Sequence, residues 1–335
     1  MDWTKTIIIA EAGVNHNGDL AMAKTLIERA AEAGADFVKF QTFITEEVIS
    51  KDAPKATYQQ ASTGTTESQF DMVKKLELSK ADHYELQAHC KVKGIGFLST
   101  PFDLPSIDLL HDMQLKAVKI PSGEINNVPY LRHIAGKFDT YFLSTGMSDI
   151  REISFAVELL QQSGVALSQL IILHCNTEYP TALSDVNLRA MQTIANQFKT
   201  KVGYSDHTIG WEVAVAAVAL GACVVEKHFT LSKTLPGPDH QASLEPAELV
   251  LLVEKIRGIE VALGSSEKLI SDSAKRNALV AKKSLVARVA IAKGTAFTAE
   301  NLTVRRPGTG IPAMEWDNWI GKAAQRDYAA GERID

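Results

Sequence analysis

Short runs of β-forming residues alternate with segments of helical periodicity along most of the chain. Strands are predicted for Thr6–Ala10, Phe37–Phe40, Ile95–Leu98, Ala117–Ile120, Tyr141–Leu143, Leu170–Leu173, Lys201–Tyr204 and Ala222–Glu226. Helices are predicted for Leu20–Ala33, Asp149–Gln162, Leu183–Phe198, Glu212–Leu220 and Glu245–Leu263. Strands joined through helices lie parallel, so about eight of them predict an α/β fold with a closed (β/α)8 barrel. An open doubly wound sheet is the alternative, and the absence of a GxGxxG turn after the first run disfavours it.

The last two predicted strands are each followed by a histidine, His207 and His228. Because a strand–helix–strand unit of this size places its strands parallel, both histidines emerge at the same end of the sheet. This arrangement predicts a two-histidine metal site, and the alternative is that each histidine only caps a strand end. Polar residues close by in the sequence favour the metal site: Ser205, Asp206 and Asp239.

Polar residues also follow the other predicted strands. They are Glu11, Asn15 and His16; Lys39 and Gln41; Ser99 and Thr100; Lys119, Ser122, Gly123 and Glu124; Ser144, Thr145 and Gly146; and His174, Asn176, Thr177 and Tyr179. The carboxyl ends of parallel barrel strands share one face, so these side chains are expected to converge on one catalytic pocket. For any single Ser, Thr or Asn, bonding to turn backbone is the simpler explanation. A longer insert, Thr42–Ser79, is expected to lie above the barrel mouth as a lid.

A polar segment separates the predicted barrel from the end of the chain. Gly264–Lys283 is charged and serine-bearing, and it predicts a linker with a helical turn. Residues 284–335 have short alternating runs and their own turn signals, which predict a small second domain. The expected organisation is a catalytic barrel over 1–263, a linker over 264–283 and a terminal domain over 284–335. A domain this small is marginally stable alone, so it is expected to pack against a barrel, its own or a partner's.

Charge and composition limit the classes of partner. Thirty-five basic and 40 acidic residues give a net charge of −5, and no lysine or arginine run is long enough to follow a nucleic acid or an anionic membrane. Neither partner is expected. No signal peptide opens the chain and no apolar stretch reaches the length of a membrane span, which predicts a soluble, cytoplasmic protein.

An ordered set of motifs resembles the sialic acid synthase family over essentially the whole chain. The motifs are IIIAEAGVNHNGD, VKFQTF, STPFD, KIPSGE, LSTGM, LHCNTEYP, YSDHT, EKHFT, GPDHQAS and, near the end, RRPGTGI. The resemblance implies a TIM barrel followed by an antifreeze-like (SAF) domain, in a domain-swapped homodimer. It implies condensation of phosphoenolpyruvate with an N-acylated hexosamine: N-acetylmannosamine, giving N-acetylneuraminate, is the main expectation. The alternative is 2,4-diacetamido-2,4,6-trideoxymannose, giving N,N'-diacetyllegionaminate.

The resemblance also implies roles for individual residues. His207 and His228 would hold a divalent metal, Mn²⁺ or Mg²⁺, whose task would be to polarise the sugar aldehyde. Lys39 and Lys119 would hold the phosphate and carboxylate of phosphoenolpyruvate, and Glu11 would be a catalytic acid or base. Further hydroxyls around the anions are those of Thr100, Ser122, Ser144, Thr177 and Ser205. Positions that would face the sugar are Gln41, Glu124, Tyr179, Asp239 and, from the other subunit, Arg306, with Glu11 or Glu124 guiding the attacking water.

Two other functions compete with this interpretation. A non-catalytic sugar-binding protein is one alternative, but two lysines together with metal ligands exceed what such a protein needs. A sugar-phosphate aldolase or isomerase is the other, because many barrels of this type bind phosphorylated sugars. Such an enzyme would need a further basic cluster for its second phosphate, whereas the expected sugar-facing positions in the barrel are neutral or acidic.

Overall fold

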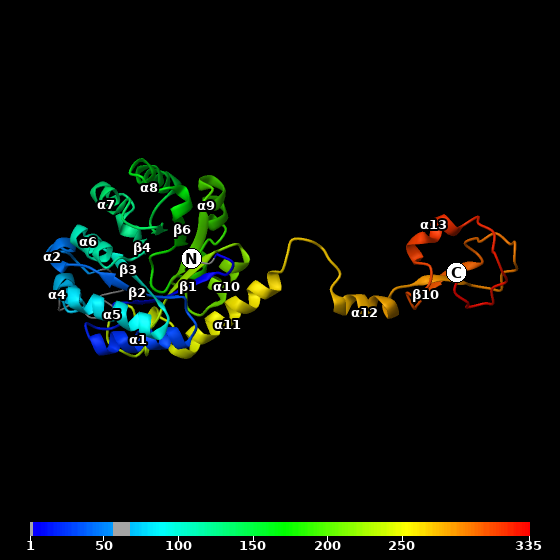
Figure 1. Cartoon of the computed structure of the whole chain (residues 1–335), viewed down its shortest axis with the longest axis horizontal. Helices are drawn as coiled ribbons and strands as arrows, with labels where there is room; N and C mark the ends of the chain where they lie inside the picture. The colour runs from blue at the N-terminus through cyan, green and yellow to red at the C-terminus, as the bar shows by residue number, and fades with distance from the viewer. Residues whose placement is uncertain (1–2, 56–67) are drawn as a thin grey trace. The chain divides into compact units, whose positions relative to one another are not determined.

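The computed structural model describes residues 3–55 and 68–335, and its larger unit is a barrel of eight parallel strands (Figure 1). The strands are β1 (Ile7–Gly13), β2 (Phe37–Thr42), β3 (Gly96–Pro101), β4 (Ala117–Ile120), β5 (Thr140–Ser144), β6 (Leu170–Cys175), β7 (Lys201–Asp206) and β8 (Val224–His228). They are hydrogen-bonded in the order β3-β2-β1-β8-β7-β6-β5-β4, which makes a near-closed barrel. The predicted (β/α)8 fold is confirmed, and the open doubly wound sheet is wrong.

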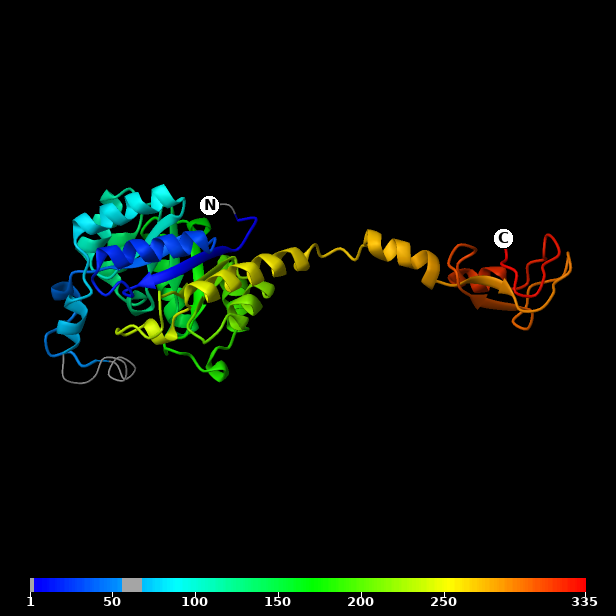
Figure 2. The same ribbon diagram turned by 90° about the horizontal axis from the view of Figure 1, so that it is seen from below.

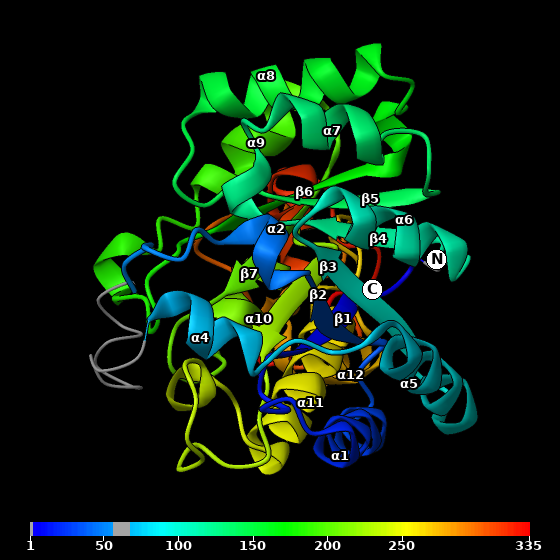
Figure 3. The same ribbon diagram turned by 90° about the vertical axis from the view of Figure 1, so that its left-hand side faces the viewer.

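Helices cover the outside of the barrel, except for two short ones in the insert after β2, which contribute residues to the pocket at its mouth. The helices are α1 (Leu20–Glu32), α2 (Thr45–Val48), α4 (Gln69–Lys74), α5 (Lys80–Lys93), α6 (Leu104–Asp112), α7 (Val128–Ile134), α8 (Ile150–Gln162), α9 (Ala190–Phe198), α10 (Glu212–Ala219) and α11 (Pro246–Leu263). Helix α1 lies beside α5 and α11, as Figure 2 shows, and α7, α8 and α9 cover the opposite side in Figure 3. The N-terminal cap of α1 is Asp19, and the buried residues of α1 recur at helical spacing: Ala23, Leu26, Ile27 and Ala30.

Alternation along the strands divides the barrel interior into two layers. Inward-facing residues near the amino ends form an apolar cluster that consists of Ile7, Ile9, Leu98, Ala117, Phe142, Ile171, Leu173 and Val224. Successive strand residues point to opposite faces, so the next inward positions lie two residues later. On β1 that position is Glu11, on β4 it is Lys119, and on β8 it is Glu226. The apolar layer therefore lies beneath a polar one at the carboxyl ends.

The insert after β2 is described only in part. Its residues 56–67 lie outside the described part of the chain, whereas the flanking pieces form α2 and α4. Both helices contribute residues to the pocket at the barrel mouth. Its action as a lid stays a prediction.

The chain divides into two compact units, Met1–Gly264 and Ser265–Asp335. The second contains α12 (Asp272–Ala281), the antiparallel pair β9 (Ser284–Ala287) and β10 (Leu302–Arg305), and α13 (Trp316–Trp319). Leu285, Phe297 and Tyr328 belong to its own apolar cluster. Helix α12 is ten residues long, longer than the predicted helical turn. In the described ranges, no helix has the length and apolar character required to cross a membrane.

Candidate active site

A pocket opens at the carboxyl ends of the barrel strands, within the first unit. All but two of the predicted site residues line it: Glu11, Lys39, Gln41, Thr100, Lys119, Ser122, Ser144, Thr177, Tyr179, Ser205, His207, His228 and Asp239. They come from all eight strands or the loops directly after them, because inward alternation and parallel strand direction bring these positions together. The two exceptions are Glu124 and Arg306.

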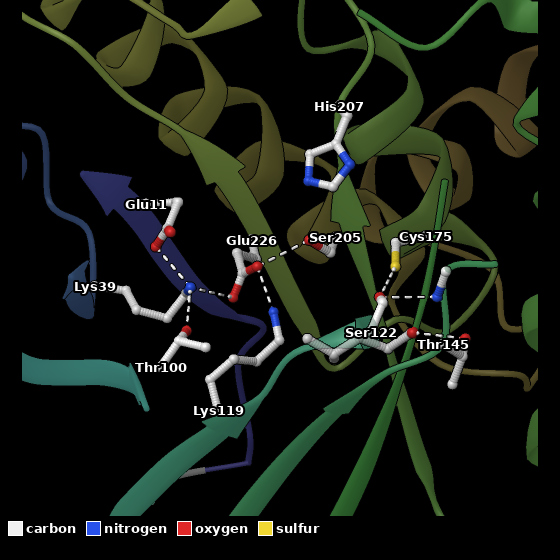
Figure 4. Close-up of polar contacts among 12 residues, drawn as sticks. Glu11, Lys39, Thr100, Lys119, Ser122, Thr145, Cys175, Ser205, His207 and Glu226 are labelled. Carbon is white, nitrogen blue, oxygen red and sulfur yellow. Dashed lines mark hydrogen bonds and ion pairs between the residues drawn. The ribbon is translucent and has the colours of Figure 1, made fainter. Parts of the chain in front are cut away.

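A buried cluster of two lysines and two carboxylates forms the floor of the pocket (Figure 4). The Lys39 ammonium lies 2.7 Å from a Glu11 oxygen and donates to Thr100 Oγ1 at 2.8 Å. Glu226 accepts from Lys119 Nζ at 2.5 Å and lies 3.8 Å from Lys39 Nζ. A further bond to Glu226, from Ser205 Oγ, is 2.8 Å long. Each lysine is therefore paired with a carboxylate in a water-poor environment.

Glu226 is a site residue that was not predicted, because in the sequence it ends the apolar run Ala222–Glu226. The available signal was its spacing, because it lies two residues before His228 on the same strand and therefore shares its face. It lies beside both lysines, so it is a central member of the charged floor.

Burial and the charges of the two lysines together give the two carboxyl groups different pKa values. Burial raises the pKa of Glu11 to about 7, although neighbouring Lys39 acts in the opposite direction. Burial would raise the pKa of Glu226 too, but the charges of Lys119 and Lys39 outweigh it and hold that pKa below its usual value. Of the two groups at the floor, Glu226 therefore stays ionised, and Glu11 is able to exchange a proton near neutral pH.

The two predicted metal-binding histidines lie next to each other at the rim. Their ring centroids are 5.3 Å apart, and the Tyr179 ring lies 4.1 Å from the His207 ring. His207 Nδ1 is 2.5 Å from the carbonyl oxygen of Asn176. A carbonyl only accepts, so Nδ1 carries the hydrogen and Nε2 keeps its lone pair. Burial lowers the pKa of His207 to about 4 and that of His228 well below its usual value, so both rings are neutral, as metal ligands must be.

The donor set at this rim fits a divalent ion with open positions. The Nδ1 atom of His228 is buried and lacks a hydrogen-bond partner in the described part of the chain. Within residues 3–55 and 68–335, no three or more His, Cys, Asp and Glu side chains are grouped to hold a metal. Two imidazoles alone leave positions for water and substrate oxygen, as a catalytic rather than a structural site requires. The metal itself stays a prediction.

Small residues and hydroxyls line the side of the pocket next to the lysines. Ser122 Oγ accepts from the backbone N–H of Gly146 at 2.9 Å and lies 3.4 Å from Cys175 Sγ, as Figure 4 shows. A Cβ atom at Gly146 would lie 2.6 Å from Thr177 Cγ2. Only glycine permits this close approach. Ser144 also lines the pocket, so the ends of three strands, β4, β5 and β6, place hydroxyl groups on this side.

The predicted sugar-facing residues divide into three cases. Gln41, Tyr179 and Asp239 line the pocket, and burial raises the pKa of Asp239 to about 6. Glu124 is half-buried and adjoins the pocket through Gly123, accepting from Asn127 Nδ2 at 2.5 Å. Arg306 lies in the second unit, exposed, where its Nε donates to the Ala281 carbonyl at 3.0 Å. Its contact with a partner's sugar stays a prediction.

One wall of the pocket is apolar, a feature that sequence analysis did not predict. This apolar wall consists of Val14, Phe43, Val48, Ile49, Met72, Val73, Leu76 and Phe102. Most of these residues come from the loop and helices between β2 and α5. The lysine floor and the apolar wall give the pocket one end suited to an anion and one suited to methyl groups.

Comparison with known proteins places the chain in a family. Residues 26–268 match the model of the NeuB family, and residues 282–335 match the SAF domain. The chain is 53% identical to the N,N'-diacetyllegionaminic acid synthase of Campylobacter jejuni, over 98% of this chain and 99% of that protein. It is 48% identical to the enzyme of the same name from Legionella pneumophila, over 98% of this chain and 92% of that protein.

A solved structure agrees with this assignment. The N-acetylneuraminic acid synthetase of Leptospira borgpetersenii, in complex with citrate, superposes with a TM-score of 0.73 at 35% identity, covering 82% of this chain and 90% of that one. These relatives are synthases, so the non-catalytic sugar-binding alternative is not retained. The chain therefore belongs to the NeuB family of sialic acid synthases and is a phosphoenolpyruvate-dependent enzyme that forms carbon–carbon bonds.

Proposed function

We propose that this enzyme is an N,N'-diacetyllegionaminate synthase, which condenses phosphoenolpyruvate with 2,4-diacetamido-2,4,6-trideoxymannose and water and releases phosphate. The main support is its likeness, over almost the whole chain, to two relatives that carry this name. The resemblance in sequence motifs predicted N-acetylmannosamine as the sugar, with the diacetamido sugar as the alternative. The relatives favour that alternative.

The distribution of charge in the pocket supports one anionic substrate. In the described part of the chain, Lys39 and Lys119 are the basic residues of the lining, and both lie at the floor. Phosphoenolpyruvate matches them with its phosphate and carboxylate. A phosphorylated sugar would bring a second phosphate towards the apolar wall, where its charge would be desolvated without a partner.

The apolar wall supports a deoxygenated, twice acylated sugar. The trideoxy sugar carries a methyl group at C6 and acetamido groups at C2 and C4, whereas N-acetylmannosamine has hydroxyl groups at C4 and C6. Burying an apolar carbon stabilises a complex by about 0.8 kcal/mol of binding free energy, whereas burying a hydroxyl group without a hydrogen-bond partner costs more than that. Phe43, Met72 and Leu76 therefore favour the diacetamido sugar.

A side-by-side assay tests the proposed substrate. With saturating phosphoenolpyruvate, kcat/KM for the diacetamido sugar is expected to exceed that for N-acetylmannosamine by about 10- to 100-fold, the discrimination that one or two apolar contacts provide. Phosphate release and product mass are the measurements. A higher kcat/KM for N-acetylmannosamine would refute the proposal and would instead support an N-acetylneuraminate synthase.

Two matched variants tie this preference to the apolar wall. Val48→Asn places an amide on the apolar wall. It is expected to lower the ratio of kcat/KM between the two sugars severalfold, because a methyl group of the sugar would have to displace water bound to the amide. Val250→Asn on α11 is the control, since Val48 and Val250 are 38% and 37% exposed and Val250 is not a lining residue. It should leave the preference unchanged.

The chain's own residues support a mechanism by C–O cleavage. Lys39, Lys119 and the surrounding hydroxyls would hold phosphoenolpyruvate so that its C3 faces the sugar aldehyde. A divalent ion held by His207 and His228 would supply Lewis-acid polarisation of that aldehyde. Attack by C3 leaves positive character at C2, to which water adds under the guidance of Glu11 or Glu124. Collapse of the tetrahedral intermediate gives the keto acid and expels phosphate with its bridging oxygen.

Isotope labelling distinguishes C–O from P–O cleavage. Phosphoenolpyruvate labelled with ¹⁸O at the bridging oxygen is expected to deliver the label to inorganic phosphate, since the sequence carries no motif for a nucleophile at phosphorus, such as a P-loop. Mass spectrometry of both products reads the result. Label retained in the sugar acid would contradict the mechanism.

The assembly and its surroundings complete the proposal. We propose a domain-swapped homodimer in which Arg306 of one chain contacts the acylamino group of the sugar in the other, and a cytoplasmic location. The exposed position of Arg306 and the separate SAF-matching unit support the exchange. Small molecules, not nucleic acids or membranes, are the proposed ligands, in keeping with the net charge of −5.

A further inference from the structure

Another buried ion pair, separate from those of the floor, lies behind the pocket, on the outward faces of the last two strands. Lys227 Nζ is 2.8 Å from Asp206 Oδ2, and the exposed fractions of the two side chains are 1% and 0%. Glu226 and His228 lie in the pocket lining, so alternation directs Lys227 between them to the opposite face. Its outward neighbour Val225 belongs to the apolar cluster between barrel and helices. The pair therefore lies next to an apolar cluster.

The contacts of this pair enclose the peptide that carries His207. Lys227 Nζ also donates to the carbonyl oxygen of Thr208 at 2.7 Å. Asp206 Oδ1 accepts from the backbone N–H of Thr208 at 2.9 Å and from its hydroxyl at 2.8 Å. The residues on both sides of His207 are thus bonded to one network, and the lysine of that network directly precedes His228.

Stability alone does not account for this arrangement. A buried ion pair loses the hydration of both charges, and an apolar pair of similar volume is often neutral or stabilising by comparison. The surrounding cluster contains Val225, Leu249 and Leu252, so apolar residues would suit the same position. What an apolar pair would lack is the set of directed bonds to Thr208, which fix the end of β7 relative to β8.

We propose that Lys227 and Asp206 are positioning residues, which hold His207 and His228 at a fixed separation so that both imidazoles bind one divalent cation. The inference rests on the proposed metal site and goes beyond it, because neither residue faces the pocket. Partners of metal ligands fix the orientation of those ligands, and their loss typically reduces metal affinity by 10- to 100-fold. Here the support acts through the backbone on both sides of a ligand rather than through its ring.

Mn²⁺ binding to the full chain without substrates tests the proposal. Lys227→Met is expected to raise the Kd for Mn²⁺, measured by calorimetry or electron paramagnetic resonance, by about 10-fold or more. Phosphoenolpyruvate affinity should stay near that of the wild type, because Lys39 and Lys119 are unchanged. Arg257→Met is the matched control: Arg257 pairs with Asp36 and the Thr6 carbonyl at the amino ends of the strands, so it should lower Tm without changing the Kd for Mn²⁺.

A double variant separates positioning from stability and covers the case in which Lys227→Met does not fold. Asp206→Leu together with Lys227→Met leaves no unpaired buried charge, so Tm is expected to recover towards the wild-type value. The Kd for Mn²⁺ should remain raised, because the bonds to Thr208 are still absent. Recovery of both quantities would overturn the positioning role. If His228→Ala binds Mn²⁺ with the same Kd as the wild type, the proposed metal site is wrong, and this inference with it.

Discussion

Removal of divalent metal from the purified enzyme is expected to abolish turnover, and Mn²⁺ or Mg²⁺ added back is expected to restore it. The reason is that polarisation of the aldehyde would contribute several kcal/mol to the condensation, so its loss should slow the reaction by about 10³-fold or more. His207 and His228 are both neutral and adjacent, which makes them competent ligands. Phosphate release before and after dialysis against a chelator is the measurement.

Two controls make the metal result specific. Stripped enzyme should still bind phosphoenolpyruvate, because Lys39 and Lys119 do not depend on the metal. His228→Ala should reproduce the loss in the presence of added metal, whereas His89→Ala, on the outer helix α5 beside Glu28, should not. Full activity in exhaustively stripped protein would contradict the metal-dependent mechanism.

Replacement of Lys119 by methionine is expected to lower kcat/KM for phosphoenolpyruvate by about 10²-fold or more. The Lys119 side chain has two functions: it would bind the substrate anion, and its Nζ lies 2.5 Å from a Glu226 oxygen, whose charge it neutralises. Truncating one member of a buried, hydrogen-bonded charge pair costs about 2–5 kcal/mol. Steady-state kinetics and calorimetric binding of phosphoenolpyruvate measure the effect, and Tm reports the accompanying loss of stability.

A second variant separates the two functions of Lys119. In Lys119→Met with Glu226→Gln, no buried carboxylate lacks its lysine, so part of the lost Tm should return while phosphoenolpyruvate affinity stays low. Lys201→Met, at the exposed start of β7, serves as the control for loss of a lysine from the same barrel and should leave both quantities unchanged. Wild-type affinity in Lys119→Met would argue against a role of this lysine in anion binding.

Sequence periodicity located the barrel strands, and the differences are confined to their ends. The prediction for β4 coincides with the structure, whereas β7 continues past Tyr204 to Asp206. Seven of the predicted strands ended at an apolar or aromatic residue and the eighth at Glu226, but strand hydrogen bonds continue through polar residues whose side chains enter the pocket. Helix α9 begins at Ala190 rather than Leu183, because Asn187 adopts a left-handed backbone conformation that interrupts the helix.

The site was predictable only where direction along a strand determines which residues meet. Parallel strands place Lys39, Lys119 and His228 at one end of the barrel, and the structure brings them to one pocket. The apolar wall was not predictable, because apolar residues in a loop insert have the same sequence signature whether they line a pocket or a core. Phe43 and Leu76 are such residues: both side chains are largely buried, and both line the pocket.

The two layers of the barrel interior separate the positions that specify the fold from those that specify the chemistry. Ile9, Phe142 and Leu173 fill the interior below, while the charged and hydroxylated positions above contribute little to that filling. Substitutions in the apolar wall can therefore accumulate without loss of the barrel, whereas the buried charge pairs of the floor lose stability when one partner alone is replaced. A scaffold of this kind is free to diverge towards new acylated sugars through its rim, with phosphoenolpyruvate chemistry retained at the floor.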